Sequence, residues 1–318
     1  MRRIVCGGLV VACLLGLVAW AAPWTEIAPL NVARSKHRAV ALDGKIYVVG
    51  GNDVDGKCAP VEVYDPTANT WTVLGPSPVN CEMPCLATVG GKIYSLAGRT
   101  SAKVRTLSGY VWDPASGVVA WKPVPGGMTM AHGDAACVVI GTKIYLLTGE
   151  DDSLTNTGYD YVEATDVFDV ATLKWSTAAP LVKRGREDFD ATAVGTKIVV
   201  VAGQGGPDQG ALRWLSVYEA ATNTWQHWDE GVPLPWEHPR TLTVGEYVYI
   251  MTGRGEGAFV NYRLDLATMA WTEHTPPPEP VTSCAAVVLG GKIYLMGGVH
   301  LDGTLLARVF VYDPCQDK

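Results

Sequence analysis

The segment Gly44-Lys45-Ile46-Tyr47-Val48-Val49-Gly50-Gly51 decides the fold of this 318-residue chain. Its first half, Gly-Lys-Ile-Tyr, recurs at residues 91–94 and 291–294, and related segments begin at Thr142, Thr196 and Glu246. A glycine pair or its remnant follows each of them, as Gly50-Gly51, Ala97-Gly98, Thr148-Gly149, Ala202-Gly203, Thr252-Gly253 and Gly297-Gly298. The second glycine is present in all six units, so the chain is an array of six repeats.

Tryptophan and acidic residues mark the same repeats. Trp24, Trp71, Trp121, Trp175, Trp225 and Trp271 are separated by 47, 50, 54, 50 and 46 residues. An aromatic-acidic step precedes them or closes the series, at Tyr64-Asp65, Trp112-Asp113, Phe168-Asp169, Tyr218-Glu219 and Tyr312-Asp313, with Leu264-Asp265 as a weaker version. Each repeat therefore has the same internal layout.

Each repeat is predicted to form four short β-strands. In the first repeat these are residues 38–42, 45–49 and 61–64, followed by a strand that begins at Trp71. The segment 65–69, Asp-Pro-Thr-Ala-Asn, has the composition of a turn. Strand patterning at this spacing, without long helical periodicity, indicates an all-β propeller.

These residues resemble the kelch motif, which combines a double glycine, an aromatic-acidic step and a tryptophan. The resemblance covers about residues 24–315 and implies a six-bladed kelch β-propeller. The last repeat lacks its tryptophan strand, whereas Trp24-Thr25-Glu26-Ile27 mirrors Trp71-Thr72-Val73-Leu74. We therefore expect the N-terminal strand to complete the sixth blade, and residues 22–318 to form a single propeller domain.

Residues 1–21 have the layout of a secretory signal peptide. Arg2 and Arg3 precede an apolar run from Ile4 to Trp20, and small residues stand three positions apart near its end. We expect cleavage after Ala21 and a secreted or periplasmic location. An uncleaved membrane anchor and lipid attachment at Cys13 stay open as alternatives. No later segment approaches the roughly 18 apolar residues of a membrane helix, so the mature protein is expected to have no membrane span.

The charge balance narrows the class of partner. The formal net charge is −7, and it becomes −9 when the two arginines of the leader are removed. Nucleic acids and anionic membranes attract basic surfaces, so we expect neither as a partner.

One face of the ring is predicted to carry the recognition surface. The loops between the second and third strands and the connections between blades share this face, which we call the loop face. Its candidate ligand-binding residues are Arg34, His37, Arg38, Arg99, His132, Asp134, Arg186, Glu187, Asp188, Trp236, Glu237, His238, Arg240 and Arg254. Arginine guanidinium groups can bind carboxylates through paired hydrogen bonds, and the Trp236 ring offers a face for stacking. These residues are therefore expected to bind a sugar, a carboxylated sugar or a peptide. In the alternative interpretation, most of these residues are solvated rim charges and a few form ion pairs between blades.

Signatures of catalysis are sparse. The sequence has no His-Glu-x-x-His, Gly-x-Ser-x-Gly or phosphate-binding Gly-Lys-Ser/Thr motif, and we assign no catalytic residue, no cofactor and no metal. Glu187 or Glu237 beside an arginine could act as a general base. The acidic run 150–152 could ligate calcium, although such runs are usually solvated loops.

Six cysteines remain after the leader. Cys58 and the pair Cys81 and Cys85 fall on the loop face of the first two blades, so a disulfide from Cys58 to either, or between Cys81 and Cys85, is plausible in an oxidising compartment. Cys137 and Cys284 are expected to be buried free thiols, and Cys315 has no obvious partner.

The sequence favours a binding module whose loop face meets a protein or glycan. An enzyme is the alternative, since exported six-bladed kelch propellers include N-acetylneuraminate mutarotases, which use a glutamate and an arginine. A copper radical oxidase similar to galactose oxidase would need seven blades and a copper ligand set. A subunit that self-associates in an extracellular assembly is a further alternative.

Overall fold

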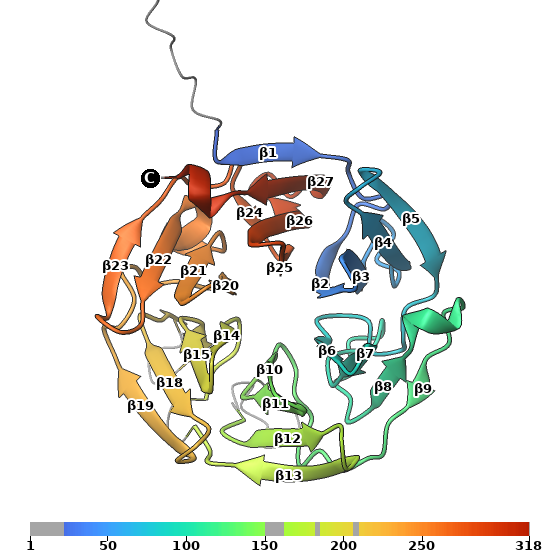
Figure 1. Ribbon diagram of the computed structural model, residues 1–318, viewed down its shortest axis with the longest axis horizontal. Helices are drawn as coiled ribbons and strands as arrows, with labels where there is room; N and C mark the ends of the chain where they lie inside the picture. The colour runs from blue at the N-terminus through green and yellow to red at the C-terminus, as the bar shows by residue number, and fades with distance from the viewer. Residues whose placement is uncertain (1–21, 150–161, 182–184, 206–209, 318) are drawn as a thin grey trace, which may run out of the picture.

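Six antiparallel sheets stand around a common axis (Figure 1). The structure is a computed structural model that describes residues 22–149, 162–181, 185–205 and 210–317. The predicted six-bladed β-propeller is confirmed. The predicted signal peptide, residues 1–21, lies outside the described residues. The part of the chain that the structure describes contains no helix with the length and apolarity needed to cross a bilayer.

The strands of each blade follow one another from the axis to the rim. Blade 1 contains β2 (Ser35–Leu42), β3 (Lys45–Asn52), β4 (Val61–Asp65) and β5 (Thr70–Gly75); blade 2 contains β6 (Cys85–Val89), β7 (Lys92–Leu96), β8 (Gly109–Trp112) and β9 (Lys122–Pro123); blade 3 contains β10 (Ala136–Ile140), β11 (Lys143–Leu147), β12 (Thr165–Asp169) and β13 (Lys174–Ala178). Blade 4 contains β14 (Asp190–Val194), β15 (Lys197–Val201), β18 (Leu215–Glu219) and β19 (Thr224–Trp228); blade 5 contains β20 (Arg240–Val244), β21 (Tyr247–Met251), β22 (Asn261–Asp265) and β23 (Ala270–Glu273); blade 6 contains β25 (Ala285–Leu289), β26 (Lys292–His300), β27 (Leu305–Tyr312) and β1 (Trp24–Ile27).

Short elements occupy the loops. β16 (Gln204–Gly205) pairs with β17 (Gly210–Ala211), and β24 (Val281–Thr282) pairs with β26. The described residues also form three 3₁₀ turns: η1 (Pro114–Ser116), η2 (Gly255–Phe259) and η3 (Pro314–Gln316).

The first strand of the chain closes the ring. β1 pairs antiparallel with β27, and its register places Trp24 opposite Tyr312 and Ile27 opposite Val309. Figure 1 shows the blue β1 on the outside of the red blade 6. The prediction that the N-terminal strand completes the sixth blade is therefore confirmed, and the ring has no open blade edge between its two ends.

The repeated Lys-Ile-Tyr segment supplies the core of each blade. Its second residue is fully buried in every blade, at Ile46, Ile93, Ile144, Ile198, Val248 and Ile293. Burying one such side chain stabilises the fold by about 1.5–3 kcal/mol. Separate apolar clusters fill the gaps between neighbouring blades, as where Tyr64 and Trp71 of blade 1 pack with Tyr294 and Val309 of blade 6. The core is thus six interfaces between sheets.

At the rim, the repeated tryptophan ties each blade to the preceding one. Its indole N–H donates to a backbone carbonyl in the connection that enters the blade, with donor–acceptor distances of 2.7–3.1 Å in all six blades. The pairs are Trp24–Thr275, Trp71–Ala28, Trp121–Pro76, Trp175–Pro125, Trp225–Ala179 and Trp271–Gly231. The same ring packs on the aromatic residue of the aromatic-acidic step, with centroids 5.0 Å apart for Tyr64 and Trp71.

Near the axis, the second glycine of each pair ties each blade to the next. Its N–H donates to a carbonyl that lies just before the next inner strand, at 2.6–3.3 Å, and the pairs are Gly51–Cys81, Gly98–His132, Gly149–Arg186, Gly203–Trp236, Gly253–Val281 and Gly298–Arg34. A Cβ atom at this glycine would lie 2.4–3.0 Å from a carbonyl oxygen of its own blade, that of Ser35, Glu82, Gly133, Glu187, Glu237 or Thr282. Only glycine allows this approach, which explains why all six repeats carry it.

The close approach predicts the effect of Gly51→Ala. Gly51 and Gly44 have similar φ values, +79° and +74°, but a Cβ at Gly51 meets the Ser35 carbonyl at 2.4 Å, whereas nothing lies within 4 Å of one at Gly44. Gly44→Ala should lower the free energy of unfolding by about 1 kcal/mol through φ alone. Gly51→Ala should lower it by more than about 3 kcal/mol, because backbone must also move. Urea denaturation followed by tryptophan fluorescence measures both, and equal losses would contradict the close-contact explanation.

Candidate functional site

The two kinds of loop predicted to share a face do meet there. Isolated backbone bridges join residues before an inner strand to the loop between second and third strands, at Glu82–Arg99, Glu187–Gln204 and Glu237–Arg254. Each blade enters the ring through five residues whose structure repeats, which we call the entry segment: residues 34–38, 81–85, 132–136, 186–190, 236–240 and 281–285. Position within this segment decides where a side chain goes.

The first position of the entry segment points into the protein. Arg34, His132, Arg186 and Trp236 are each fully buried. Each donates from its side chain to the carbonyl of the first residue of the glycine pair, at Gly50 (3.2 Å), Thr148 (2.7 Å), Ala202 (3.2 Å) and Thr252 (2.6 Å) respectively.

Ion pairs complete the burial of two of these groups. Arg34 pairs with the fully buried Glu62, and the His132 Nε2 lies 3.1 Å from Asp166. Because Trp236 is fully buried, its ring offers no face on which a ligand could stack. This corrects the expectation from the sequence. Arg34, His132 and Arg186 support their own blades from inside, and the ion pairs of Arg34 and His132 lie within one blade rather than between blades.

The third position forms a ring around the axis on the loop face. It is occupied by Lys36, Met83, Asp134, Asp188, His238 and Ser283, all with φ between 48° and 59°. Non-glycine residues adopt this left-handed conformation at a cost of about 1–2 kcal/mol. Backbone hydrogen bonds between neighbouring blades offset it, from Lys36 to Ser283 (2.8 Å), Met83 to Lys36 (2.8 Å) and His238 to Asp188 (2.6 Å).

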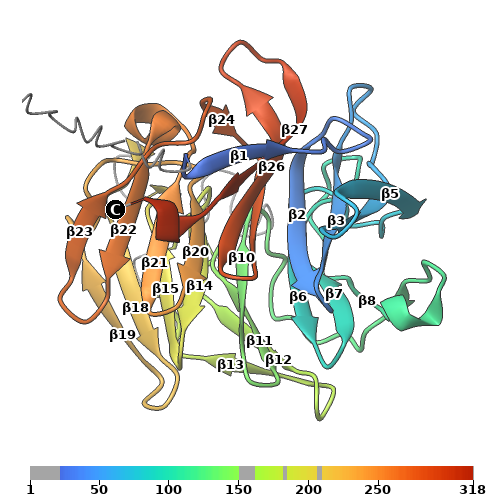
Figure 2. The ribbon, with the colours of Figure 1, turned by 45° about the horizontal axis from the view of Figure 1, so that its top comes forward.

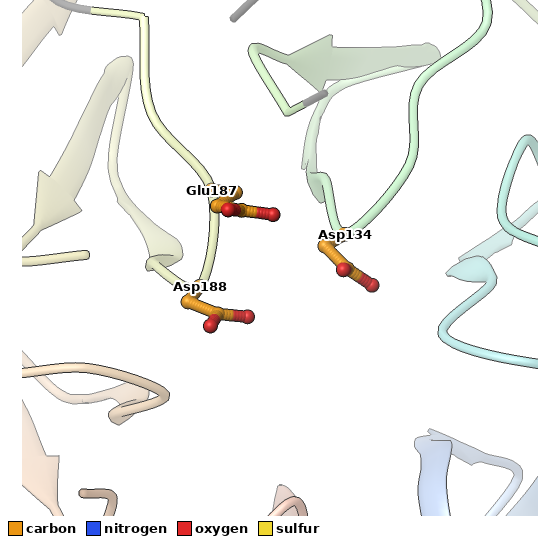
Figure 3. Close-up of side chains that lie close together, drawn as sticks. All are labelled: Asp134, Glu187 and Asp188. Carbon is orange, nitrogen blue, oxygen red and sulfur yellow. The ribbon is translucent and has the colours of Figure 1, made fainter. Parts of the chain in front are cut away.

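Three carboxylates gather beside this ring, where blades 3 and 4 meet. Asp134, Glu187 and Asp188 each place an oxygen within 4.8 Å of the others, and Figure 3 shows them at the inner edge of their two blades. Arg99 hydrogen-bonds to Asp134, and the His238 Nε2 lies 2.8 Å from Asp188. Burial works against ionisation of Asp188, but the bond from His238 outweighs it and lowers the pKa of that carboxyl.

Glu187 is the member of this cluster whose negative charge is least favourable. Burial, together with the charges of Asp188 and Asp134, raises the pKa of Glu187 from 4.5 to about 7, although Arg99 and Arg105 oppose the shift. A carboxyl group that exchanges its proton near neutral pH can act as a general acid or base. The three carboxylates could also supply hard oxygen ligands to a cation, but Arg99 and His238 already satisfy two of them.

A second charged group lies across the ring, between blades 1 and 2. The fully buried Glu82 accepts hydrogen bonds from Lys36 (2.7 Å), Asn52 (3.1 Å) and Lys103. Burial alone would raise the pKa of Glu82, but these bonds outweigh it and bring the pKa to about 2. Glu82 is therefore a fixed negative charge that holds two lysines at the mouth of the ring.

The fifth position of the entry segment lines the axis itself. Its residues Arg38, Cys85, Ala136, Asp190, Arg240 and Ala285 surround a cavity of about 130 Å³. His37 lies beside it, fully buried, and burial together with the charges of Arg34 and Arg38 holds its pKa well below the ordinary 6.5.

The comparisons with known proteins agree with this architecture. A family profile described as the KLHDC2/KLHL20/DRC7 Kelch-repeats domain matches residues 134–318, and one described as the Kelch motif matches residues 33–78. The chain belongs to the kelch-repeat family. Kelch-like protein terF of Aspergillus terreus is 27% identical over 295 residues, which cover 87% of this chain and 63% of that protein.

Other relatives are longer proteins. Beta-scruin of Limulus polyphemus is 29% identical over 213 residues, which cover 64% of this chain and 23% of that protein. Kelch-like protein 25 of Xenopus tropicalis is 25% identical over 214 residues, which cover 64% of this chain and 34% of that protein. The chain thus spans less than two thirds of the length of each relative.

The predicted site residues of this kelch propeller fall into three groups. Arg34, His37, His132, Arg186 and Trp236 are interior; Arg99, Asp134, Glu187, Asp188, Glu237, His238 and Arg254 lie at the mouth; Arg38 and Arg240 lie on the axis. Sequence reasoning missed Lys103 and Arg105, although both follow Arg99 in the same loop and three basic residues in seven positions could have drawn attention. The acidic run 150–152 lies outside the described residues.

The predicted disulfide among Cys58, Cys81 and Cys85 is not formed, whereas Cys137 and Cys284 are free thiols, as predicted. All six described cysteines, including Cys58, Cys81 and Cys85, are free thiols, so the structure contains no disulfide among the residues it describes. The thiols of Cys58 and Cys81 nevertheless interact, because Cys81 is the main cause that raises the pKa of Cys58 and Cys58 the main cause that lowers that of Cys81. Cys137 contacts the thiol of Cys85 on the neighbouring blade, a pairing that the phase of the repeats did not reveal.

The raised pKa of Glu187 predicts a pH-dependent effect of Glu187→Gln. Between pH 4.5 and about 7 the folded state binds a proton at Glu187 more tightly than the unfolded chain does, so stability falls as pH rises through this window. Glu187→Gln should therefore raise the free energy of unfolding by about 1–2 kcal/mol at pH 8.5, after allowance for solvent screening, and change it little at pH 4.5. Urea titrations at both pH values test this.

The exposed Glu246 provides the matched control. Glu246→Gln should leave the difference in stability between pH 4.5 and pH 8.5 unchanged. If Glu187→Gln were destabilising at pH 8.5, the carboxylate cluster would be favourable as it stands and the assignment of a strained Glu187 would be wrong.

Proposed function

We propose that this kelch propeller is a protein-binding module that engages its partner through the loop face. The observation that carries the proposal is the distribution of exposed apolar side chains. Of the twelve large apolar residues exposed in the described part of the chain, six lie in loops of this face: Val54, Val79, Val104, Leu107, Phe259 and Leu301. Their side chains are 46–78% exposed.

The six residues follow an arc rather than a random scatter. Phe259 belongs to blade 5, Leu301 to blade 6, Val54 and Val79 to blade 1 and its exit, and Val104 with Leu107 to blade 2. These four blades are consecutive around the ring, and Figure 2 shows the β26–β27 hairpin rising above it. Exposed apolar groups bordering a polar centre are typical of protein interfaces.

The remaining blades give the surface its polarity. The carboxylate cluster lies on blades 3 and 4, opposite the middle of the apolar arc. Arg254 and Lys103 are exposed between the two. This combination favours a polypeptide that has both apolar and charged side chains. A glycan is less favoured, because Trp236, the ring predicted to stack on a sugar, is buried.

Selection from a displayed library of random peptides tests this function. We expect peptides enriched on the immobilised protein to lose at least tenfold in affinity when Val104 and Leu107 are both changed to serine, because the apolar contact is removed. The matched control changes Val118 and Leu173 to serine, since both are exposed but lie in turns between third and fourth strands. The control should bind within twofold of the original protein.

Two outcomes would overturn the proposal. Enriched peptides that bind the Val104/Leu107 variant and the original protein equally well would place recognition elsewhere. Failure to enrich any peptide, together with binding to a sugar array that depends on Arg254, would favour the glycan partner instead.

We further propose that the protein is exported and acts in an oxidising compartment. The leader-like composition of residues 1–21 supports export, and the contact between the Cys58 and Cys81 thiols supports a disulfide there. In exchange with a low-molecular-weight disulfide, the two thiols would give up two protons and two electrons and form one S–S bond, while the reagent is reduced to two thiols.

Expression of the full sequence in a bacterium that exports proteins tests both points. Mass spectrometry of the exported protein should show an N-terminus at Ala22 and, after chymotrypsin cleavage without reduction, a linked pair of peptides containing Cys58 and Cys81. Cys58→Ser should abolish that link while leaving the new N-terminus in place. An intact leader would contradict export, and free Cys58 in exported protein would contradict the disulfide alone.

A further inference from the structure

The axial cavity holds an unbalanced charge. Its fifth-position residues are small in blades 2, 3 and 6, at Cys85, Ala136 and Ala285, and charged in blades 1, 4 and 5, at Arg38, Asp190 and Arg240. Two guanidinium groups therefore share a cavity of about 130 Å³ with one carboxylate.

Asp190 interacts with Arg240 and with a backbone amide. The Asp190 Oδ2 lies 3.7 Å from Arg240 Nη1 and also accepts a hydrogen bond from the Thr241 amide at 2.8 Å. Arg240 donates from Nε to the Cys284 carbonyl at 2.7 Å. Its Nη2 has no hydrogen-bond partner, although the residue is 96% buried. One donor group of a buried guanidinium is thus left unsatisfied.

Arg38 has no acidic partner. Its Nη1 donates to the neighbouring His37 carbonyl at 3.2 Å, and none of the described carboxylates lies within ion-pair distance of it. Loss of hydration and the charge of Arg240 lower the pKa of Arg38, although the charges of Asp190 and Asp134 oppose the shift.

Burial disfavours the charged form of three further titratable groups near the cavity. His37 has a pKa held well below 6.5 by burial, so it adds no charge at pH 7. The hydrogen bond with Cys85, together with burial, raises the pKa of Cys137, and burial raises that of Cys284. The three charged side chains of the cavity therefore sum to +1. Arg240 is buried and Arg38 and Asp190 are half-buried, so hydration of these charges is reduced and an anion would be favoured there.

We propose that the axial cavity binds one small oxyanion, inorganic or carboxylate, between Arg38 and Arg240. A guanidinium presents paired N–H donors that match two oxygens of such an ion. A cavity of about 130 Å³ has room for an ion of four or five heavy atoms.

This site is separate from the loop-face surface. Its residues occupy the fifth position of the entry segments, whereas the mouth is formed by the second and third positions and the loops beyond them. The bound ion would act on the ring from within, because it joins inner strands of blades 1 and 5 that otherwise repel each other electrostatically.

Thermal unfolding of the whole protein in different anions tests the proposal. An ion that binds only the folded state raises the melting temperature as its concentration rises. Sodium phosphate, sulfate, formate and acetate should raise it in the millimolar range relative to sodium chloride of equal ionic strength, and the rank among them identifies whether an inorganic ion or a carboxylate fits better. Selenate in crystals should give an anomalous peak between Arg38 and Arg240.

Three variants make the test specific. Arg38→Gln removes only one hydrogen bond to a neighbouring carbonyl and should reduce affinity for the preferred anion at least tenfold. Asp190→Asn should do the opposite and increase affinity at least tenfold, because it removes the competing negative charge while keeping an acceptor for the Thr241 amide. Arg254→Gln, on the exposed mouth, should leave the response unchanged.

Specific results would overturn the site. Melting temperatures that depend on ionic strength alone would show that no oxyanion binds in the cavity. A response lost in Arg254→Gln but kept in Arg38→Gln would place the ion at the mouth. A weaker response in Asp190→Asn than in the original protein would contradict the charge argument even if Arg38→Gln failed to fold.

Discussion

The close contact at the second glycine of each pair governs the rest of the structure. This glycine lies against a carbonyl of its own entry segment and donates its N–H to the entry segment of the next blade, six times around the ring. The contact fixes how the backbone turns as it approaches the axis. It thereby fixes which entry position is buried, which reaches the mouth and which lines the cavity. A side chain larger than hydrogen at this point would displace all three together.

At the first entry position, different side chains supply a hydrogen-bond donor to the same buried carbonyl group. Each first residue of a glycine pair presents a carbonyl to the interior, and a buried carbonyl needs a donor. Arginine, histidine and tryptophan all supply it in different blades, as described for Arg34, His132 and Trp236. In blade 2 the position is Cys81, and the preceding Asn80 donates to the Ala97 carbonyl at 2.6 Å instead. Polar residues here thus serve the fold whatever their charge.

The variety of residues at the first entry position shows which parts of the structure the sequence does not predict. Glycine and tryptophan spacings predict the strands, the six blades and the closing strand, because those depend on periodic residues whose contacts repeat. The charged residues do not repeat, and adjacent positions differ in direction because the third entry residue is left-handed, as at Asp134 and Asp188. Arg186 and Glu187 are neighbours in sequence, yet one is buried in a blade and the other lies in the mouth.

The unfavourably placed charges lie where the repeating contacts that stabilise the fold do not constrain the side chains. Apolar interfaces between blades and the tryptophan hydrogen bonds at the rim stabilise the propeller away from the axis, and the glycine hydrogen bonds hold the backbone near it. Side chains at the axis can therefore be unfavourably placed without loss of the fold. The two clearest cases, the strained Glu187 and the unbalanced Arg38, both lie there. Groups that weaken a fold persist when the surrounding structure holds them firmly, and they are the groups that a bound ligand can satisfy. The axis and mouth are therefore where this propeller has room to recognise something other than itself.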